Sequence, residues 1–215
     1  MTKRSELLDY YAETHARRVY GTSSVKYVRF IKPWIALRRP ASILDYGCGQ
    51  SIFLEQLELG DDVELRRYDP AIPDYSHPPA SRSDLLICID VLEHIPETEI
   101  DAALREMRAW SKEAIVVADT APSRHRLPDG RNAHVTLHPH RWWQQRIAAV
   151  FGVAEAISAP RSSRAAFKTW TSDAAEQRAY KRLRIRADIR HYAFCAVRMH
   201  KRAWKVSSTG KTSQS

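Results

Sequence analysis

The sequence predicts an α/β protein with a doubly wound, mainly parallel sheet. Short apolar segments alternate with amphipathic ones over residues 40–150, which is typical of this class. The runs 85–89 and 114–118 contain no polar side chain, as expected for parallel strands that are covered on both faces. The turn Gly47-Cys48-Gly49 follows the run 42–46 directly, which favours a strand, a tight ligand-binding loop and a helix.

Length and composition predict one domain. The 215 residues are 44% hydrophobic and 27% charged, which is ordinary for a globular protein. We expect a single domain over residues 1–206, with a helical N-terminal cap (1–39), a core (40–200) and a disordered polar tail (207–215). No run approaches the roughly 18 apolar residues of a membrane span, and no secretory signal is expected. Three widely spaced cysteines favour a reducing, cytoplasmic location over a disulfide framework.

The net charge of +9 comes from 34 Lys and Arg against 25 Asp and Glu. It allows either a nucleic-acid partner or a basic surface without a dedicated partner. The positive charge is concentrated near the C-terminus, in Arg178, Lys181, Arg182, Arg184, Arg186, Arg190, Arg198, Lys201, Arg202 and Lys205. Such a run is usually a solvated face, and the alternative is contact with a phosphate backbone.

The elements expected before residue 70 are two helices, a strand, a helix and a strand. They cover residues 5–19, 25–37 (with Pro33 marking a kink or a first turn), 42–46, 52–59 and 63–69.

After residue 70 we expect first a loop, because residues 70–83 hold four prolines and no periodic pattern. The further elements expected are a strand at 85–89, a helix at 98–110, a strand at 114–119, irregular chain at 120–141, a helix to about 150, a strand at 151–159, a basic loop at 161–171, a helix at 172–186 and a last strand at 191–198.

Asp69 ends the second expected strand, twenty residues after Gly49. In dinucleotide-type folds a carboxylate at this place binds the ribose hydroxyls of a nucleoside. A carboxylate suits this role because it accepts two hydrogen bonds from a vicinal diol. Taken alone, Asp69 would be read as the acidic end of a surface strand. Its spacing from the glycine turn favours the ligand-binding interpretation.

A nicotinamide cofactor is disfavoured by one position in the same loop. The dinucleotide fingerprint needs a third glycine three residues after the second, so that the helix packs closely on the strand. The residue there is Ile52. The sequence therefore argues against a dehydrogenase.

Three motifs in this order resemble the class I S-adenosylmethionine-dependent methyltransferases. They are Asp45-Tyr46-Gly47-Cys48-Gly49, Asp69, and Asp90-Val91-Leu92-Glu93-His94-Ile95. The resemblance is clearest over residues 40–120. It implies a Rossmann-like fold of seven strands with the last antiparallel, S-adenosyl-L-methionine as cofactor, and methyl transfer as the reaction.

The resemblance also implies where the cofactor binds. Residues 47–49 would line its methionine part, Asp69 would hold the ribose hydroxyls, and residues 90–94 would lie under the methionine and face the substrate. The implied cofactor-binding residues are Asp45, Tyr46, Gly47, Cys48, Gly49, Ser51, Asp69, Pro70, Asp90, Val91, Leu92 and His94.

The chain departs from the family pattern between Asp69 and Asp84. The family normally has a helix, a third strand and an adenine-contacting acid there, whereas only fourteen residues intervene here. We therefore expect a reduced sheet that lacks the third strand, with the Pro-rich loop covering the adenine. Pro70 and Ala71 are the nearest candidates for contact with the base.

Methyl transfer needs a base only if the acceptor atom carries a proton. Histidine is the natural candidate near neutral pH. We expect His134 in this role, with His94 second, because both lie beyond the carboxyl ends of predicted strands. No metal site is expected: His134, His138 and His140 are close in sequence, but no cysteine or acidic pattern accompanies them.

The expected acceptor is a small molecule. The alternatives are methylation of nucleic acid, and a non-catalytic nucleic-acid-binding protein that uses the basic C-terminal segment. The sequence predicts no membrane association and leaves the oligomeric state open. In the N-terminal cap, Tyr11, His15, Tyr20 and Lys26 are candidates for a lid over the cofactor, or for ordinary packing and solvated positions.

Overall fold

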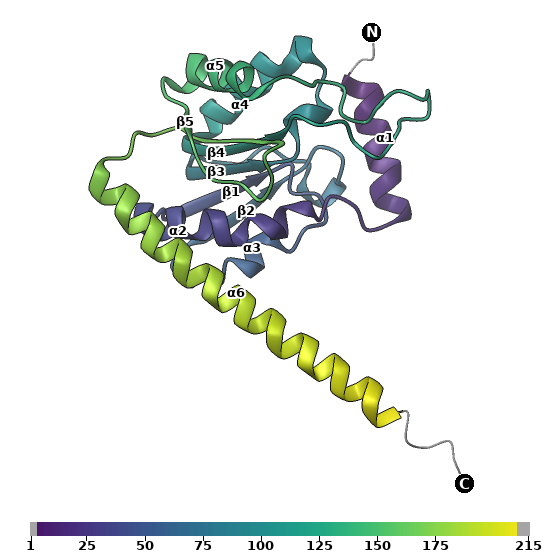
Figure 1. Ribbon diagram of the computed structural model, residues 1–215. Coiled ribbons are helices and arrows are strands. Elements are labelled where there is room, and N and C mark those ends of the chain that lie inside the picture. The colour runs from purple at the N-terminus through teal and green to yellow at the C-terminus, as the bar shows by residue number, and fades with distance from the viewer. Residues whose placement is uncertain (1–3, 210–215) are drawn as a thin grey trace.

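The computed structural model describes the backbone of residues 4–209 and the side chains of residues 6–192. Its centre is one six-stranded sheet in the order β2-β1-β3-β4-β6-β5 (Figure 1). The strands are β1 (Ser42–Tyr46), β2 (Glu64–Tyr68), β3 (Ser83–Ile89), β4 (Ser111–Asp119), β5 (Glu155–Ala156) and β6 (Arg164–Lys168). Strands β1 to β4 are parallel, and β6 is antiparallel to β4 and to β5.

Helices cover both faces of this sheet, as the doubly wound prediction requires. They are α1 (Arg4–Arg17), α2 (Val28–Arg38), α3 (Phe53–Gln56), α4 (Ile100–Trp110), α5 (His140–Phe151) and α6 (Ala174–Thr209). Helices α4 and α5 lie on one face, α2, α3 and α6 on the other, and α1 lies beside one end of the sheet (Figure 1). None of the described helices combines the length and the apolar character that a bilayer-spanning segment needs.

The two hydrophobic cores follow from the alternation of side chains along each strand. In β1, Leu44 packs into the cluster that contains α4 and α5, whereas Ile43 packs into the cluster that contains α2 and α3. In β3, Leu86 and Leu85 divide in the same way. All four side chains are buried, which explains why these runs lack polar residues.

The expected loss of the third strand is confirmed. Strand β2 pairs only with β1 and forms the edge of the sheet among the described strands. Residues 69–82 then lead through a short 3-10 helix, Pro73–Tyr75, to β3 on the other side of β1. A segment of fourteen residues with four prolines is too short to form a helix and a further strand, so the chain passes directly from β2 to β3.

The prediction of a basic loop at 161–171 was wrong. This segment contains β6, the antiparallel strand between β4 and β5. Its terminal charges made it look solvent-exposed, but both are buried and paired: Arg164 with Asp90 and Asp119, and Lys168 with Glu155. The three residues between them are small or aromatic and pack into the cores.

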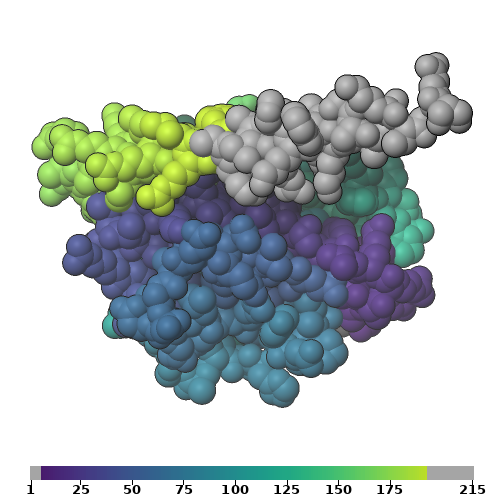
Figure 2. All heavy atoms as spheres, turned by 90° about the horizontal axis from the view of Figure 1, so that it is seen from below, coloured from purple at the N-terminus to yellow at the C-terminus, as the bar shows by residue number. Residues whose placement is uncertain are grey.

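The prediction of a last strand at 191–198 was also wrong, because these residues continue α6. No Gly or Pro occurs between residues 174 and 209, so nothing in the sequence ends the helix that begins at Ala174. The first half of α6 packs on α2, where the rings of Trp34 and Tyr180 stack with centroids 4.0 Å apart. Figure 2 shows the part of α6 up to residue 192 beside the N-terminal elements at one edge of the molecule.

Three predicted boundaries change. Helix α3 is a single turn instead of 52–59, because Glu58 adopts a left-handed backbone conformation (φ 47°). The strand expected at 151–159 is only β5, since α5 runs to Phe151 and ends at Gly152. Residues 207–209 of the expected tail belong to α6, and residues 210–215 lie outside the described part of the chain.

Candidate active site

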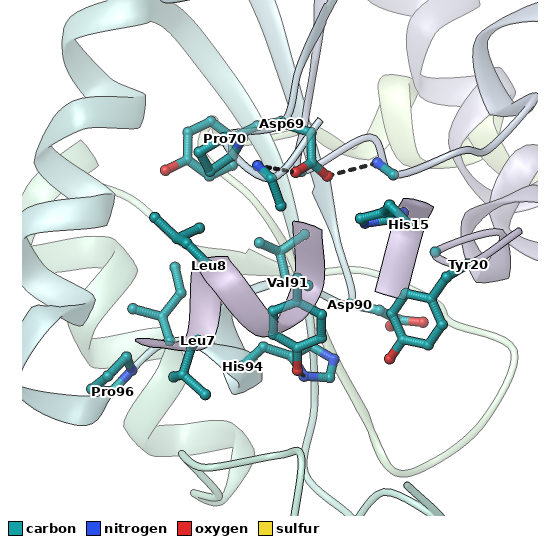
Figure 3. A pocket seen from close by; sticks show the side chains of 17 residues that line it. Leu7, Leu8, His15, Tyr20, Asp69, Pro70, Asp90, Val91, His94 and Pro96 are labelled. Atoms are coloured by element: carbon teal, nitrogen blue, oxygen red, sulfur yellow. Dashed lines mark hydrogen bonds between the residues drawn. The ribbon is translucent and has the colours of Figure 1, made fainter. Parts of the chain in front are cut away.

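A pocket opens at the carboxyl ends of β1, β2 and β3, and α1 covers one side of it (Figure 3). It encloses about 740 Å³, counting the part that is open to solvent. The predicted cofactor-binding residues that line it are Tyr46, Gly47, Gly49, Asp69, Pro70, Asp90, Val91 and His94. Open α/β sheets bind ligands at this place, because the loops that follow parallel strands meet there.

The other four predicted residues do not line this pocket. Leu92 is fully buried in the core on the side of α4 and α5. Cys48 is buried within the loop, and Ser51 accepts hydrogen bonds from the Ser24 hydroxyl and the Phe53 amide. Asp45 is buried, and this burial raises the pKa of its carboxyl to about 7.

The glycine turn is shaped by close backbone and side-chain contacts. Gly47 (φ +70°) lies so near Val91 that a Cβ there would be 2.4 Å from a methyl of that residue. Gly49 (φ +53°) faces the backbone of Gly21, where a Cβ would be 2.8 Å from the carbonyl oxygen. The amides of Gly47 and Cys48 both donate to Tyr68 O, at 2.7 and 3.1 Å. Only glycine fits both the conformation and the space at 47 and 49.

Asp69 closes the same loop from the end of β2. Its Oδ2 accepts from the Gly49 amide and its Oδ1 from the Ala71 amide, each at 2.9 Å (Figure 3). The residue is 8% exposed, and that exposure is toward the pocket it lines. Each carboxylate oxygen has a second lone pair, so Asp69 can hold the loop and still accept hydrogen bonds from a ligand.

Asp90 is held at the end of β3 by three groups from two distant segments, residues 23–27 and β6. It has a left-handed backbone conformation (φ 56°). Its carboxylate accepts from the Ser23 hydroxyl at 2.5 Å, from Tyr27 Oη at 3.1 Å and from the Arg164 guanidinium at 2.8 Å. The same Arg164 nitrogen lies 2.6 Å from Asp119. These contacts fix the Asp90 side chain at the wall of the pocket.

Glu93 lies behind this wall and is fully buried. Its Oε1 accepts from the Asp119 amide at 3.0 Å and lies 3.6 Å from Arg164. Its Oε2 has no hydrogen-bond partner. Burial, and next the charge of Asp90, raise the pKa of the Glu93 carboxyl well above its usual value.

The N-terminal segment forms one wall of the pocket. Tyr11, His15 and Tyr20 line it, whereas the fourth lid candidate, Lys26, is exposed and not part of the lining. Gln50 links this segment to the glycine loop by two hydrogen bonds. Its side-chain Oε1 accepts from the Tyr20 backbone amide at 2.9 Å, and its backbone amide donates to Tyr20 O at 3.1 Å.

His94 and His134 meet although forty residues separate them. Their rings are in edge-to-face contact with centroids 4.8 Å apart. His94 Nδ1 lies 2.9 Å from Ala133 O and 2.7 Å from Tyr11 Oη, and His134 Nδ1 lies 2.6 Å from Ala121 O. Burial, and next the neighbouring His134, lower the pKa of His94 to about 3. Of the two, only His94 lines the pocket.

The other two histidines of the segment lie apart from this pair. His138 Nε2 is 2.9 Å from Glu97, and its ring stacks on Trp142 with centroids 3.9 Å apart. His140 begins α5 and is exposed. The three histidines that are close in sequence therefore do not form one cluster.

Several residues of the site were not expected from the sequence. Gly21 is not among the residues predicted for the site, and its contact with Gly49 depends on the path of the N-terminal segment. Arg164 had been placed in a basic loop. Only the strand pairing β4–β6, which sets Asp119 opposite Arg164, brings it to the carboxylates. No local pattern in the sequence signals either contact.

Comparisons with known proteins agree with this geometry. A family model described as "Methyltransferase domain" matches residues 15–203. A search of curated protein sequences found no match. The fold is similar to 1,6-didemethyltoxoflavin-N1-methyltransferase of Burkholderia thailandensis (TM-score 0.50, 15% identity, covering 79% of this chain and 87% of that one).

The fold is also similar to magnesium protoporphyrin IX methyltransferase of Synechocystis PCC 6803 (TM-score 0.50, 15% identity, covering 76% of this chain and 97% of that one). Both structures contain bound S-adenosylhomocysteine. At these identities the likeness shows the fold alone. Together with the family model over residues 15–203, it means that the chain belongs to the methyltransferase-domain family and has the class I S-adenosylmethionine-dependent methyltransferase fold.

Proposed function

We propose that this protein transfers a methyl group from S-adenosylmethionine to a small-molecule acceptor. The observation that carries the proposal is the pocket itself. A glycine turn with two left-handed residues meets two carboxylates there, the buried Asp69 and the nearly buried Asp90, whose side chain is 10% exposed, at the ends of adjacent parallel strands. The membership of the chain in a methyltransferase family supports the same function.

The residues present fit the cofactor. Asp69 has lone pairs left for two ribose hydroxyls, and Gly47 and Gly49 line the pocket with backbone alone, so a ligand can approach the loop closely. Asp90 adds a negative charge to a wall of the pocket, which suits a ligand with a sulfonium and an ammonium group. When bound, the cofactor supplies an electrophilic methyl group, so the protein has mainly to position the acceptor.

A small acceptor fits a pocket that the N-terminal segment partly covers. Helix α1 and residues 20–21 line it together with the glycine loop, and Tyr11 Oη lies 2.7 Å from His94 Nδ1. The similar structures come from enzymes named for small or medium-sized acceptors, a toxoflavin precursor and magnesium protoporphyrin IX. Methylation of nucleic acid through the basic residues of α6 is the alternative. Part of that charge is already paired, since Arg184 contacts Asp188 within α6.

The cofactor assignment is tested by calorimetry with S-adenosylhomocysteine. Asp69→Asn keeps the shape of the side chain but removes a charged acceptor, and we expect affinity to fall by about 10- to 100-fold. Asp74→Asn removes the same charge from an exposed position five residues away and is the matched control. Equal affinity of the two variants would refute the role of Asp69.

The acceptor-side role of the histidines needs a separate test. We propose that His134 and His94 act on the acceptor, and we expect His134→Ala to abolish methyl transfer while leaving the affinity for S-adenosylhomocysteine unchanged. The assay follows transfer of labelled methyl from S-adenosylmethionine to a panel of hydroxylated, aminated and carbon-acid small molecules, and to RNA and DNA. Transfer only to nucleic acid would overturn the choice of a small acceptor.

A further inference from the structure

Glu93, His94 and His134 form a cluster of three side chains whose nitrogen and oxygen ligand atoms lie within 4.8 Å of one another. No local pattern in the sequence indicates this group, because His134 is separated from the other two residues by about forty positions. It lies directly behind the pocket, which it reaches through His94.

Both imidazoles present an unprotonated Nε2. A carbonyl oxygen only accepts hydrogen bonds, so Nδ1 of His134 donates its proton to Ala121 O, and Nδ1 of His94 donates to Ala133 O. The lone pair of each ring is therefore on Nε2. Metal-binding histidines are typically oriented in this way, by a carbonyl or carboxylate that accepts from the second ring nitrogen.

The third member supplies an oxygen that has no partner. Glu93 is fully buried, and its Oε2 makes no hydrogen bond. A buried polar atom is rarely left in this state without a functional reason such as a missing ion. The backbone around it is fixed, since Glu93 O accepts from the Thr136 amide at 3.1 Å and ties the loop that carries His134 to the segment that carries His94.

The charges behind the pocket are also unbalanced. Asp90, Glu93 and Asp119 contribute three carboxyl groups, and the Arg164 guanidinium contacts all of them. With Glu93 deprotonated, as a metal ligand is, this group carries two excess negative charges. A divalent cation beside Glu93 would neutralise it without any change in the hydrogen bonds of Arg164.

We infer that Glu93, His94 and His134 bind a divalent transition-metal cation, and that this cation holds an oxygen of the methyl acceptor. Two imidazoles and one carboxylate are a ligand set for Zn²⁺, Mn²⁺, Fe²⁺ or Co²⁺ with positions left for substrate, not for an all-oxygen Mg²⁺ site. Two ligand atoms at about 2.1 Å from one metal, in a tetrahedral or facial octahedral arrangement, are about 3.0–3.4 Å apart. The cluster, whose ligand atoms lie within 4.8 Å of one another, therefore contracts by up to about 1–2 Å on binding. His134 lies on a loop and is half-buried, which gives the ion its route of entry.

This inference about the acceptor rests on the proposed methyl transfer and names its substrate class. The cation lowers the pKa of a hydroxyl that it binds. The hydroxyl proton passes to solvent, the oxygen forms the bond to the methyl carbon, and the electrons of the breaking carbon–sulfur bond stay on sulfur. The class of acceptor is therefore a hydroxyl with a second oxygen close enough to chelate, such as a vicinal diol, a catechol or a hydroxycarbonyl.

Metal binding is tested directly with Co²⁺ as the probe. Chelator-treated full-length protein is titrated with Co²⁺ and followed by visible absorption and calorimetry. We expect one equivalent to bind, with ligand-field bands, and an affinity about 100-fold lower in Glu93→Gln and in His134→Ala. His138→Ala removes a half-buried imidazole outside the cluster and keeps wild-type binding. No stoichiometric binding, or binding that neither substitution weakens, would overturn the inference.

Two controls distinguish a loss of metal binding from a folding defect and from a failure of the proposed function. Added Zn²⁺ should raise the melting temperature of the wild type but not of His134→Ala, a loop variant, and the circular dichroism of the two apo proteins should agree. S-adenosylhomocysteine binding should be equal in both. If S-adenosylhomocysteine fails to bind while Co²⁺ binds as expected, the proposed function is wrong and the metal site stands. If S-adenosylhomocysteine binds and Co²⁺ does not, only the metal site is overturned.

Discussion

The two sides of the pocket are built in different ways. The glycine-loop side consists of residues 46–51 and Asp69, which lie within one strand–loop–helix–strand unit and are joined mainly by backbone hydrogen bonds. The histidine side consists of Glu93, His94 and His134 with Arg164 behind them, and side chains from three separate segments meet there. We therefore expect the structure of the glycine-loop side to depend mainly on backbone conformation, and that of the histidine side to depend mainly on the balance of its charges. The predictions below test this difference.

Arg164→Met should have the largest effect, because it removes the guanidinium that contacts Asp90, Glu93 and Asp119 together. Breaking a buried ion pair on one side typically costs about 3–5 kcal/mol of unfolding free energy. Urea denaturation of the variant and the wild type measures this difference in unfolding free energy. Arg161→Met changes an exposed arginine of the same segment and should stay within about 0.5 kcal/mol of the wild type. Equal stability of the two variants would mean that the cluster is not held by charge.

Gly49→Ala should damage the glycine-loop side through the backbone alone. The new Cβ would stand 2.8 Å from Gly21 O, so the N-terminal segment has to move away from the loop. Gly130→Ala is the control, since Gly130 has the same kind of positive φ (+85°) but open space around it, and both share a conformational cost of about 1–2 kcal/mol. Calorimetry with S-adenosylhomocysteine should show at least about tenfold weaker binding for Gly49→Ala only. An equal loss of cofactor affinity in both variants would contradict the importance of the contact between Gly49 and Gly21.

Asp45 gives the glycine-loop side a predictable dependence on pH. Burial raises the pKa of its carboxyl to about 7, so between about pH 4 and 7 the folded chain holds a proton that the unfolded chain has lost. Its contribution to stability is therefore present at low pH and is lost as pH rises through 7. Denaturation from pH 5 to 8 should show the wild type losing stability relative to Asp45→Asn, whereas a difference that is constant with pH would refute the shift.

Gln50→Ala should have the smallest effect, because it only loosens the connection between the glycine loop and the N-terminal segment. The hydrogen bond that is lost, from the Tyr20 amide to Gln50 Oε1, is exposed. Such a bond contributes about 0.5–1.5 kcal/mol, which corresponds to about 2- to 10-fold in cofactor affinity. Gln56→Ala, at an exposed position in α3, should bind like the wild type. A loss of cofactor affinity in both variants would indicate a general effect on the region around α3 and not a specific effect on the N-terminal segment.

The same contrast explains what the sequence could predict. The glycine turn, the spacing to Asp69 and the absence of a third strand are local patterns, and all three appear in the structure. The position of Arg164 could not be predicted, because its charge argues for solvent until the carboxylates that bury it are known. The long helix α6 was misread where aromatic and apolar residues gather near 191–198, although no helix-breaking residue occurs there.

Candidate residues for the histidine side were only partly predictable. His94 and His134 were chosen because they follow the ends of expected strands, and they are in contact in the structure. Glu93 was expected only as one of residues 90–94 that face the substrate. It is instead fully buried, and a sequence does not show which carboxylate oxygen lacks a partner. Contacts across forty residues depend on how the loop 120–136 folds back over β3 and β4, and no periodic pattern encodes that path.

A crystal structure with S-adenosylhomocysteine would test the central claim most directly. We expect the ribose hydroxyls within about 3.2 Å of the Asp69 carboxylate, which is hydrogen-bond distance. We also expect the sulfur beside the glycine loop, on the side of the pocket that His94 lines. A ligand bound elsewhere, or a ribose that makes no contact with Asp69, would contradict the account.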